Sequence, residues 1–241
     1  KMRLTIPILL YTFRLLLSVA GVRGYAVRQF DIKTAFLNGN LDEEIYLKQP
    51  AGFQNGHKVY KLKKSLYGLK QAARVWNQTL HNELVKNDCK QSETDKCLYS
   101  LESDGEICYL LVHVDDMLVA YSNEALMTKL MSGIGKTFEM KDLGFVKHFL
   151  EIDVSKDEKG NFMINQKRYI DKIVRETGQT DAKFSTHPID VGYWKLEGKT
   201  LATNEEYRKI IGMLLYLSTN SRPDIAASVS ILSQKVQSPR D

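Results

Sequence analysis

The sequence has little cysteine and no paired-cysteine motif. Its three cysteines, Cys89, Cys97 and Cys108, are odd in number and show no CxxC spacing. A disulfide-rich secreted scaffold or a structural zinc site needs more cysteines, or cysteines at regular spacings. We therefore predict reduced thiols in an intracellular protein, and no zinc site.

Long apolar runs are also missing. The first residues, KMRLTIPILLYTFRLLLSVAG, have the basic, apolar and small-residue order of a signal peptide, but Arg14 divides the apolar run. Neither piece reaches the roughly 20 residues that a membrane span needs. We expect no membrane-spanning segment, and secretion stays an alternative to an intracellular location.

Acidic residues are absent from two long segments, although the net charge of the whole chain is only +5. Residues 1–30 carry five Lys or Arg and residues 45–82 carry seven, and neither segment contains Asp or Glu. Cations among aromatic side chains suit a surface that follows a phosphate backbone and stacks against sugars or bases. A solvated basic face without a ligand is the alternative. The aromatic residues of the second segment include Tyr46, Phe53, Tyr60, Tyr67 and Trp76.

The sequence does contain one adjacent acid pair between apolar runs. In ICYLLVHVDDMLVAYS, residues 107–114 and 117–121 are separated only by Asp115 and Asp116. This spacing predicts a β-hairpin with both carboxylates at its tip. Adjacent carboxylates repel each other and lose hydration there, so a bound cation would stabilise them. A solvated polar turn is the alternative.

A third carboxylate is available upstream. Asp31 follows a short strand-like run, and no Asp or Glu precedes it in the chain. If Asp31 faces the hairpin across a sheet, the three acids supply the oxygen ligands that two-metal phosphoryl transfer needs. We predict that Asp31, Asp115 and Asp116 are catalytic residues and ligands of two Mg²⁺ or Mn²⁺ ions.

The hydrophobic pattern predicts an α+β fold. We expect strands over 26–31, 43–48, 58–62, 107–114, 117–121, 147–154 and 161–165, and helices over 69–84, 124–136 and 169–177. This order is a split βαβ pattern, an antiparallel sheet with helices on one face. Residues 178–203 are expected to form a loop. Thr203 and Glu206 then form a capping-box pattern, and Pro223 suits the first turn of a closing helix.

Five blocks occur in an order that resembles a known family. They are FDIKTAFLNGNLDEEIYLKQPAGF, VYKLKKSLYGLKQAARVWN, the HVDD hairpin, MKDLGFVKHFLEIDV and LLYLSTNSRPDIAASVSILS. Together they resemble the reverse transcriptase of copia-type long-terminal-repeat retrotransposons. The resemblance implies a polymerase palm with partial fingers over residues 1–165 and a helical thumb-like or connection-like region over 166–241. It also implies a buried helix over residues 11–20, packed under the strand that leads to Asp31.

The resemblance also implies a nucleotide site. The backbone amides of residues 32–35 could form a small anion nest for the triphosphate. Phe36 would stand under the incoming sugar and select deoxynucleotides, and an ordinary core position is its alternative. Gly68 is expected to permit close approach of the backbone. The predicted nucleotide-binding residues are Ile32, Lys33, Thr34, Ala35, Phe36, Tyr67, Gly68 and Lys70.

Template and primer contacts are expected on the basic segment and beside the hairpin. Lysine and arginine contacts to phosphates add affinity without sequence preference, and exposed helix cations are the alternative for Arg74. Four positions depart from the family: relatives have Tyr where this chain has His113, Pro where Ala73 stands, Gly where Glu151 stands, and Thr where Ser221 stands. The predicted template-primer residues are His113, Val114, Lys61, Lys63, Lys64 and Arg74.

We therefore predict RNA-directed DNA polymerase activity, the transfer of deoxynucleotides from their triphosphates to a primer 3′-hydroxyl on an RNA or DNA template. The implied context is a Pol polyprotein with RNase H and integrase regions, in a cytoplasmic virus-like particle. Without an initiator Met and a basic fingers segment, the chain is expected to be a fragment that binds template-primer and extends it poorly. The alternatives are an inactive relic that only binds nucleic acid or folds, and a two-metal nuclease.

Overall fold

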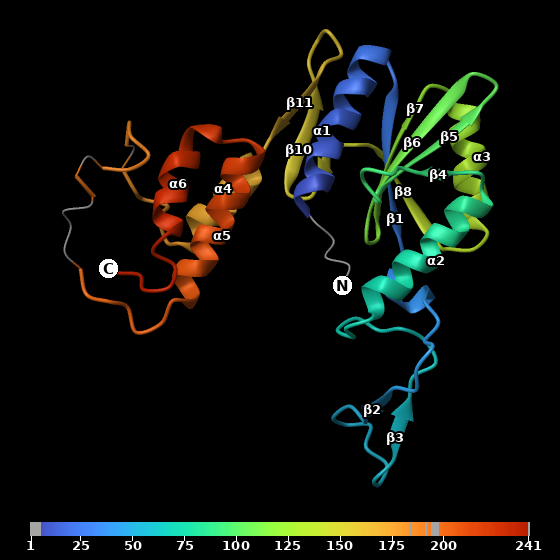
Figure 1. Cartoon of the computed structure of the whole chain (residues 1–241), viewed down its shortest axis with the longest axis horizontal. Helices are drawn as coiled ribbons and strands as arrows, with labels where there is room; N and C mark the ends of the chain where they lie inside the picture. Colours follow the sequence, from blue (N-terminus) through green and yellow to red (C-terminus); the bar gives the residue numbers. More distant parts are fainter. Residues whose placement is uncertain (1–5, 184, 191, 194–197, 241) are drawn as a thin grey trace. The chain divides into compact units, whose positions relative to one another are not determined.

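The computed structural model describes residues 6–183, 185–190, 192–193 and 198–240 (Figure 1). The chain divides into two compact units, residues 1–146 with 158–161, and residues 147–157 with 162–241. The sequence had suggested a boundary after residue 165. The strands just before that point belong to the second unit, because they pair with one another and not with the sheet of the first unit.

The first unit is built on a six-stranded sheet with the strand order β4-β5-β6-β7-β1-β8, in which every pairing is antiparallel. Its strands are β1 (Ala26–Ile32), β4 (Lys90–Gln91), β5 (Leu98–Ser103), β6 (Glu106–His113), β7 (Asp116–Tyr121) and β8 (Met140–Phe145). Its helices are α1 (Ile6–Arg23), α2 (Ala72–Lys86) and α3 (Glu124–Gly135), with a short 3₁₀ helix η1 (Ala35–Asn38) after β1.

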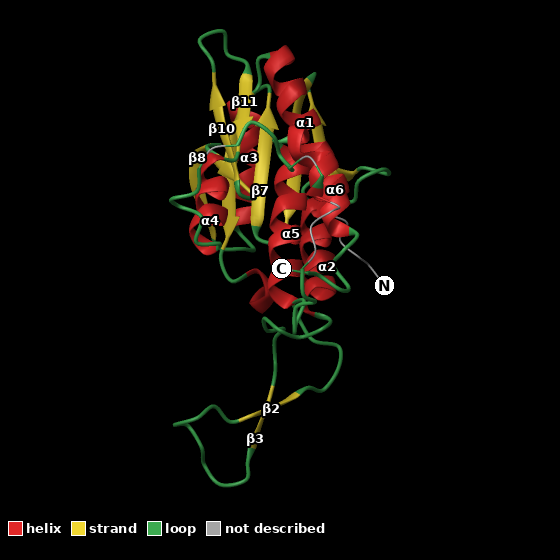
Figure 2. Cartoon of the chain, turned by 90° about the vertical axis from the view of Figure 1, so that its left-hand side faces the viewer, coloured by secondary structure: helices red, strands yellow, loops and turns green. Residues whose placement is uncertain are grey.

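Both faces of this sheet are covered by helices (Figures 1 and 2). On one face, Phe30, Val112 and Met117 share a core with buried side chains of α2 and α3. Leu111 and Leu118 point to the opposite face, because successive strand side chains alternate, and both are fully buried there. The helix α1 contacts β1, β6 and β7 and lies over that second face. The prediction of helices on one face only is therefore wrong, because continuous apolar strands need cover on both sides.

The helix α1 is a buried structural element. Phe13 and Ala20 are fully buried, whereas Tyr11 and Val22 point to solvent. The predicted buried helix over residues 11–20 is confirmed. Within the described part of the chain, no helix is both long and apolar enough to cross a membrane.

The strand β8 lies in a segment that was not predicted to be a strand. It pairs with β1 along the register Arg28↔Phe145 to Ile32↔Met140, whereas the sequence had suggested residues 147–154 as the next strand of the fold. The side chains of β8 are exposed or only partly buried. An edge strand such as this one lacks the apolar periodicity that would reveal it in a sequence.

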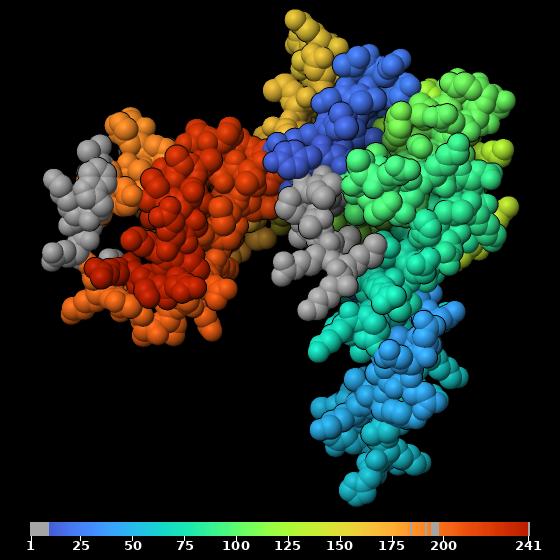
Figure 3. Space-filling view, in the orientation of Figure 1, coloured from blue at the N-terminus to red at the C-terminus, as the bar shows by residue number. Residues whose placement is uncertain are grey.

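The strands β2 (Tyr46–Lys48) and β3 (Val59–Lys61) pair as a separate hairpin, which confirms two of the predicted short strands. All their side chains are exposed, and the hairpin forms a projection from the first unit (Figure 3). At its base, the Ser65 amide donates to the Gly39 carbonyl at 2.9 Å. A Cβ at Gly39 would lie 2.7 Å from Cγ1 of Val75, so α2 packs against bare backbone at this point.

The second unit combines a small sheet with helices. Its strands are β9 (His148–Phe149), β10 (Ile152–Lys156) and β11 (Phe162–Asn165), and its helices are α4 (Lys167–Glu176), α5 (Glu205–Asn220), the 3₁₀ helix η3 (Pro223–Ile225) and α6 (Ala226–Ser233). Tyr169, Ile173 and Leu217 form its helical core. The predicted helix over 169–177 and the closing helix that starts at Pro223 are confirmed.

Two sequence-based expectations concern the start of α5 and the segment that precedes it. The capping box at Thr203 is wrong, because α5 begins after Asn204 and has no side-chain cap. The side-chain amide of Asn204 instead donates to the Val236 carbonyl at 3.1 Å. The described residues of the segment 178–203 carry no α-helix and no strand, as expected for a loop. Its residues 184, 191 and 194–197 lie outside the described part of the chain.

Candidate active site

Asp115 lies in the turn of the β6–β7 hairpin, and Asp116 lies in its second strand. His113 pairs with Asp116 across the hairpin, so the two turn residues are Val114 and Asp115. The prediction that both acids lie at the tip is wrong by one residue. Because strand side chains alternate, this register turns the side chain of Asp116 onto one face of the sheet.

Asp31 faces Asp116 directly. The two residues are Cα partners on β1 and β7, and the next amide along β1, that of Ile32, donates to the Asp115 carbonyl at 2.9 Å. The pair Asp31–Asp116 therefore falls at a non-hydrogen-bonded position, where facing side chains are closest. All three acids thus lie at the same end of the sheet.

The surroundings of Asp116 raise the pKa of its carboxyl. Burial is the largest cause, and the negative charges of Asp115 and Asp31 add to it. Nε2 of Gln29 donates a hydrogen bond of 3.1 Å to Oδ1 of Asp116 and opposes the shift. From the sequence, the adjacent carboxylates were expected both to repel each other and to lose hydration. At Asp116 repulsion ranks below burial, because the residue lies in the strand and not at the tip.

His113 is the other half of the pair that closes the hairpin. Burial lowers the pKa of its ring, although the nearby charges of Asp116 and Asp115 oppose this shift. Its Nδ1 is buried and has no hydrogen-bond partner among the described residues. A neutral imidazole suits this position.

The donor chemistry of the three acids suits a divalent cation. Like charges that face each other across two strands destabilise the pair, and Mg²⁺ prefers carboxylate oxygens, typically one or two of them together with substrate phosphates. Among the described residues, however, no group of three or more His, Cys, Asp or Glu side chains is gathered closely enough to hold an ion. Metal binding by Asp31, Asp115 and Asp116 stays a prediction.

The turn that carries Asp115 is strained. Val114 has φ of 58°, a left-handed conformation that costs an ordinary residue about 1–2 kcal/mol and is rarer still for a β-branched one. Nε1 of Trp76 donates to the Val114 carbonyl at 2.6 Å. From the sequence, Trp76 was counted among the aromatic residues of the basic segment and lay within the helix expected over residues 69–84. The signal that could have revealed this second role is general, since a buried indole N–H needs an acceptor.

The predicted anion nest is only half available. The amide of Ile32 donates to Asp115, and the amide of Lys33 donates to the Glu139 carbonyl at 2.9 Å. The ammonium group of Lys33 also pairs with the Glu139 carboxylate. These bonds belong to the sheet, so a nest that includes residues 32 and 33 is wrong. The amides of Thr34, with φ of 50°, and Ala35 remain as candidates.

Phe36 and Tyr67 lie together beside the acids. Their ring centroids are 4.5 Å apart, with a tilt of 56° between the planes. Burial raises the pKa of the Tyr67 phenol, and the negative charges of Asp115 and Asp31 raise it further. Phe36 is half-buried and packs against the core, so its predicted role as a sugar gate stays a prediction.

Gly68 has a different role from the predicted one. A Cβ at this position would meet nothing within 4 Å, so no close backbone approach depends on it. Its φ of +95° is the actual requirement, because only glycine adopts that conformation without strain.

The predicted phosphate-binding cations divide into two groups. Lys61 is paired with Glu44, and Nζ of Lys64 donates to Oδ1 of Asn40 at 2.8 Å. Lys63, Lys70 and Arg74 are exposed or partly exposed, and no ion pair is found for them within the described residues. The structure leaves their role in binding a template untested.

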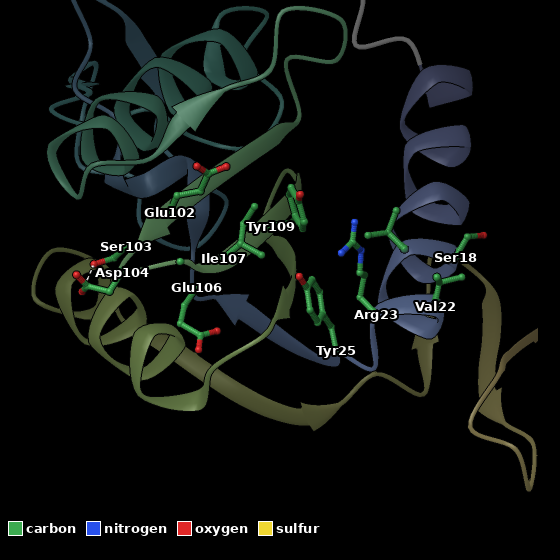
Figure 4. Close-up of a pocket in the computed structure, with 12 residues that line it drawn as sticks. Ser18, Val22, Arg23, Tyr25, Glu102, Ser103, Asp104, Glu106, Ile107 and Tyr109 are labelled. Carbon is green, nitrogen blue, oxygen red and sulfur yellow. Dashed lines mark hydrogen bonds between the residues drawn. The ribbon is translucent and has the colours of Figure 1, made fainter.

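A cleft lies at the end of the sheet opposite to the three acids. It has a volume of about 810 Å³ and is lined by the end of α1 and by the β5–β6 hairpin, including Arg23, Tyr25, Glu106 and Tyr109 (Figure 4). Tyr25 precedes β1 and Asp31 lies near its end, so the strand separates them by roughly 20 Å. This cleft therefore belongs to a different surface from the three acids.

Comparisons with known proteins identify the family of this chain. The family model described as reverse transcriptase (RNA-dependent DNA polymerase) matches residues 4–191. The chain belongs to the reverse transcriptase family. This result confirms the resemblance drawn from the five sequence blocks.

Several relatives of this reverse transcriptase domain are described as transposon proteins. It is 34% identical over 95% of its length to the retrovirus-related Pol polyprotein from transposon TNT 1-94 of Nicotiana tabacum, and 36% identical over 95% to that from transposon RE1 of Arabidopsis thaliana. It spans only 18% and 16% of those two proteins. The putative transposon Ty5-1 protein of Saccharomyces cerevisiae is 35% identical over 87% of the chain, and the match covers 70% of that relative.

Proposed function

We propose that this chain is the polymerase palm, with partial fingers and a helical thumb-like region, of a copia-type reverse transcriptase. Its reaction is the transfer of a deoxynucleotide to a primer 3′-hydroxyl, directed by an RNA or DNA template, with release of pyrophosphate. The observation that carries the proposal is the pairing of Asp31 with Asp116, next to Asp115, at one end of an antiparallel sheet.

The roles of the acids follow from this pairing. Asp31, Asp115 and Asp116 would hold two Mg²⁺ or Mn²⁺ ions between themselves and the phosphates of the nucleotide. Such ions lower the pKa of the attacking hydroxyl and neutralise the leaving pyrophosphate. Gln29 orients the carboxylate of Asp116 through its hydrogen bond, and burial of this carboxylate makes the pair more dependent on a compensating positive charge.

The surrounding residues place the substrates. Phe36 and Tyr67 form an aromatic wall beside the acids, where a nucleotide sugar and base can pack. Lys63, Lys70 and Arg74 are accessible to phosphates, and such contacts bind without sequence preference. The RNase H and integrase regions of a parent Pol polyprotein, and a cytoplasmic virus-like particle, form the proposed context.

Primer extension tests this function directly. The full chain is incubated with a homopolymer template, a complementary primer and the matching deoxynucleotide, with Mg²⁺, Mn²⁺ or EDTA. Extension that requires the metal and is lost in Asp115→Asn supports the proposal. Extension that persists in EDTA contradicts it.

The same assay separates the two alternatives. Salt-dependent binding of template-primer without extension, by this chain and by a longer polyprotein segment, is the result for an inactive relic. Degradation of a labelled duplex without added nucleotides favours a two-metal nuclease. Lys63→Ala, Lys70→Ala and Arg74→Ala together are expected to flatten the salt dependence of binding, and Lys159→Ala in the β10–β11 turn is the matched control.

A further inference from the structure

The turn that presents Asp115 is held from outside the hairpin. The carbonyl of Val114 accepts the indole N–H of Trp76 on α2, and the carbonyl of Asp115 accepts the amide of Ile32 on β1. Both peptide groups that follow the turn residues are thereby fixed by other elements. A hairpin free of such bonds would let its two-residue tip rotate, because Val114 disfavours the conformation that it adopts.

Trp76 is itself rigidly placed. Its side chain is 2% exposed, and its ring meets Phe138 edge-on at a centroid distance of 5.1 Å. It belongs to the same buried stripe of α2 as Leu80 and Leu84. The donor therefore cannot follow the turn if the turn moves, and the hydrogen bond selects one position of the Val114 carbonyl.

We propose that Trp76 is a positioning residue, whose indole N–H holds the strained turn at Val114 so that Asp115 stays beside Asp31 and Asp116. This role rests on the proposed polymerase function. The peptide plane between Val114 and Asp115 contains the bonded carbonyl, and its orientation sets the direction of the Asp115 side chain. The helix that carries Trp76 begins at Ala72, five residues after Tyr67.

The first test uses amide hydrogen exchange in the full chain and needs no catalysis. Trp76→Phe keeps an aromatic ring in the core and removes the N–H donor. The amide of Ile32, which donates to Asp115, should then exchange about 10-fold faster relative to the buried amide of Leu110, since its acceptor moves.

Tyr99→Phe is the matched control. Tyr99 is 3% exposed in the same core, and its hydroxyl accepts a 2.8 Å hydrogen bond from Gln91 and lies 3.1 Å from Nδ1 of His81, neither of which is in the turn. This variant loses both of these part-buried hydrogen bonds, but it should leave the relative exchange of Ile32 unchanged. Equal effects of the two variants would reduce Trp76 to a general core residue and overturn the proposal.

Rescue provides the second test. Val114→Gly removes the strain, because glycine accepts a positive φ. In the Trp76→Phe background it should restore the protection of Ile32 to within about threefold of the Val114→Gly single variant. Failure of this rescue would show that the indole N–H does not act through the strained turn.

Single-turnover primer extension provides the third test. Trp76→Phe should lower the maximal rate by about 10- to 100-fold, with a change of less than about threefold in half-saturation by the deoxynucleotide, because a misplaced ligand affects the reaction more than ground-state binding. A higher deoxynucleotide concentration at half-saturation with an unchanged maximal rate would contradict the positioning role. If neither the parent chain nor a longer polyprotein segment extends primers, the polymerase assignment fails, and the exchange and rescue results alone decide whether Trp76 holds the turn.

Discussion

Two turns in this protein share the same strain and the same kind of anchor. In the first unit, Val114 has φ of 58° and its carbonyl accepts the indole N–H of Trp76. In the second unit, Leu150 has φ of 49° and its carbonyl accepts the hydroxyl of Tyr216. Each turn thus places a branched apolar residue in the left-handed region and fixes its carbonyl with an aromatic donor.

The two turns differ in the residue that comes after the strained one. Val114 precedes Asp115, which stands beside two further carboxylates. Leu150 precedes Glu151, also left-handed with φ of 60°, whose carboxylate pairs with Lys172 at 3.0 Å in a half-exposed ion pair. Strain with an anchor is therefore not a mark of function by itself. The chemistry that the turn presents decides whether the strain serves a reaction.

The largest expected difference between the two turns is in catalysis. Asp115→Asn should reduce primer extension by about 10²–10³-fold or more, because it removes charge that would bind the metal ions in the transition state. Glu151→Gln, the equivalent change at the other turn, should alter the rate by less than about twofold. Steady-state extension rates of both variants test this prediction. An equal loss of rate in the two variants would show that the two turns do not differ in catalysis.

The residues around the first turn should also determine sugar choice. Phe36→Ala removes the ring that packs on Tyr67 and should raise ribonucleotide use, relative to deoxynucleotide use, by about 10- to 100-fold. The ratio of the two kcat/KM values is the measurement, and Leu37→Ala, at an exposed neighbour, is the control. An unchanged ratio in Phe36→Ala would show that Phe36 is an ordinary core residue without a role in sugar choice.

The anchor of the second turn should matter for stability alone. Tyr216→Phe should lower the free energy of unfolding by about 1 kcal/mol, the usual contribution of one hydrogen bond, and leave the rate of extension unchanged. Urea unfolding and the extension assay together test this expectation. A large loss of activity in Tyr216→Phe would give the second turn a role that its chemistry does not explain.

Asp116, the partly buried acid next to the first turn, should make stability depend on pH. The pKa of Asp116 is raised in the folded protein, so its contribution to stability is complete below the ordinary carboxyl pKa and is lost as pH rises through the raised value. Asp116→Asn should therefore be more stable than the parent at about pH 7 in EDTA, and the difference should vanish towards about pH 3. A difference that is constant across this range would mean that another property of the substitution causes it.

The smallest expected effect is at Glu151. Glu151→Gly relieves a left-handed conformation that costs about 1–2 kcal/mol, and it loses an exposed ion pair worth less than about 1 kcal/mol and some chain entropy. The net result should be a gain of a few tenths to about 1 kcal/mol in urea unfolding. Lys172→Ala, which removes only the ion pair, is the control. A loss of stability in Glu151→Gly would show that the ion pair outweighs the strain.

Much of this site was accessible from local sequence. The acids Asp31, Asp115 and Asp116, the apolar hairpin strands and the stripe of α2 are visible in the order and spacing of residues, because period and adjacency are local properties. The sequence also marked position 151 as unusual, since relatives of the predicted family carry Gly there. The structure supplies a reason for that glycine, because the backbone at Glu151 has a positive φ of 60°.

The sequence by itself determined the family, the three acids and most helices, while the tertiary structure decided how they meet. The register that sets Asp116 against Asp31, the bond from Trp76 to Val114 and the pairing of β8 with β1 all join segments that are far apart in the chain. Local periodicity carries no information about such pairings. These pairings depend on which apolar faces can be buried together, and on which polar groups then need a hydrogen-bond partner.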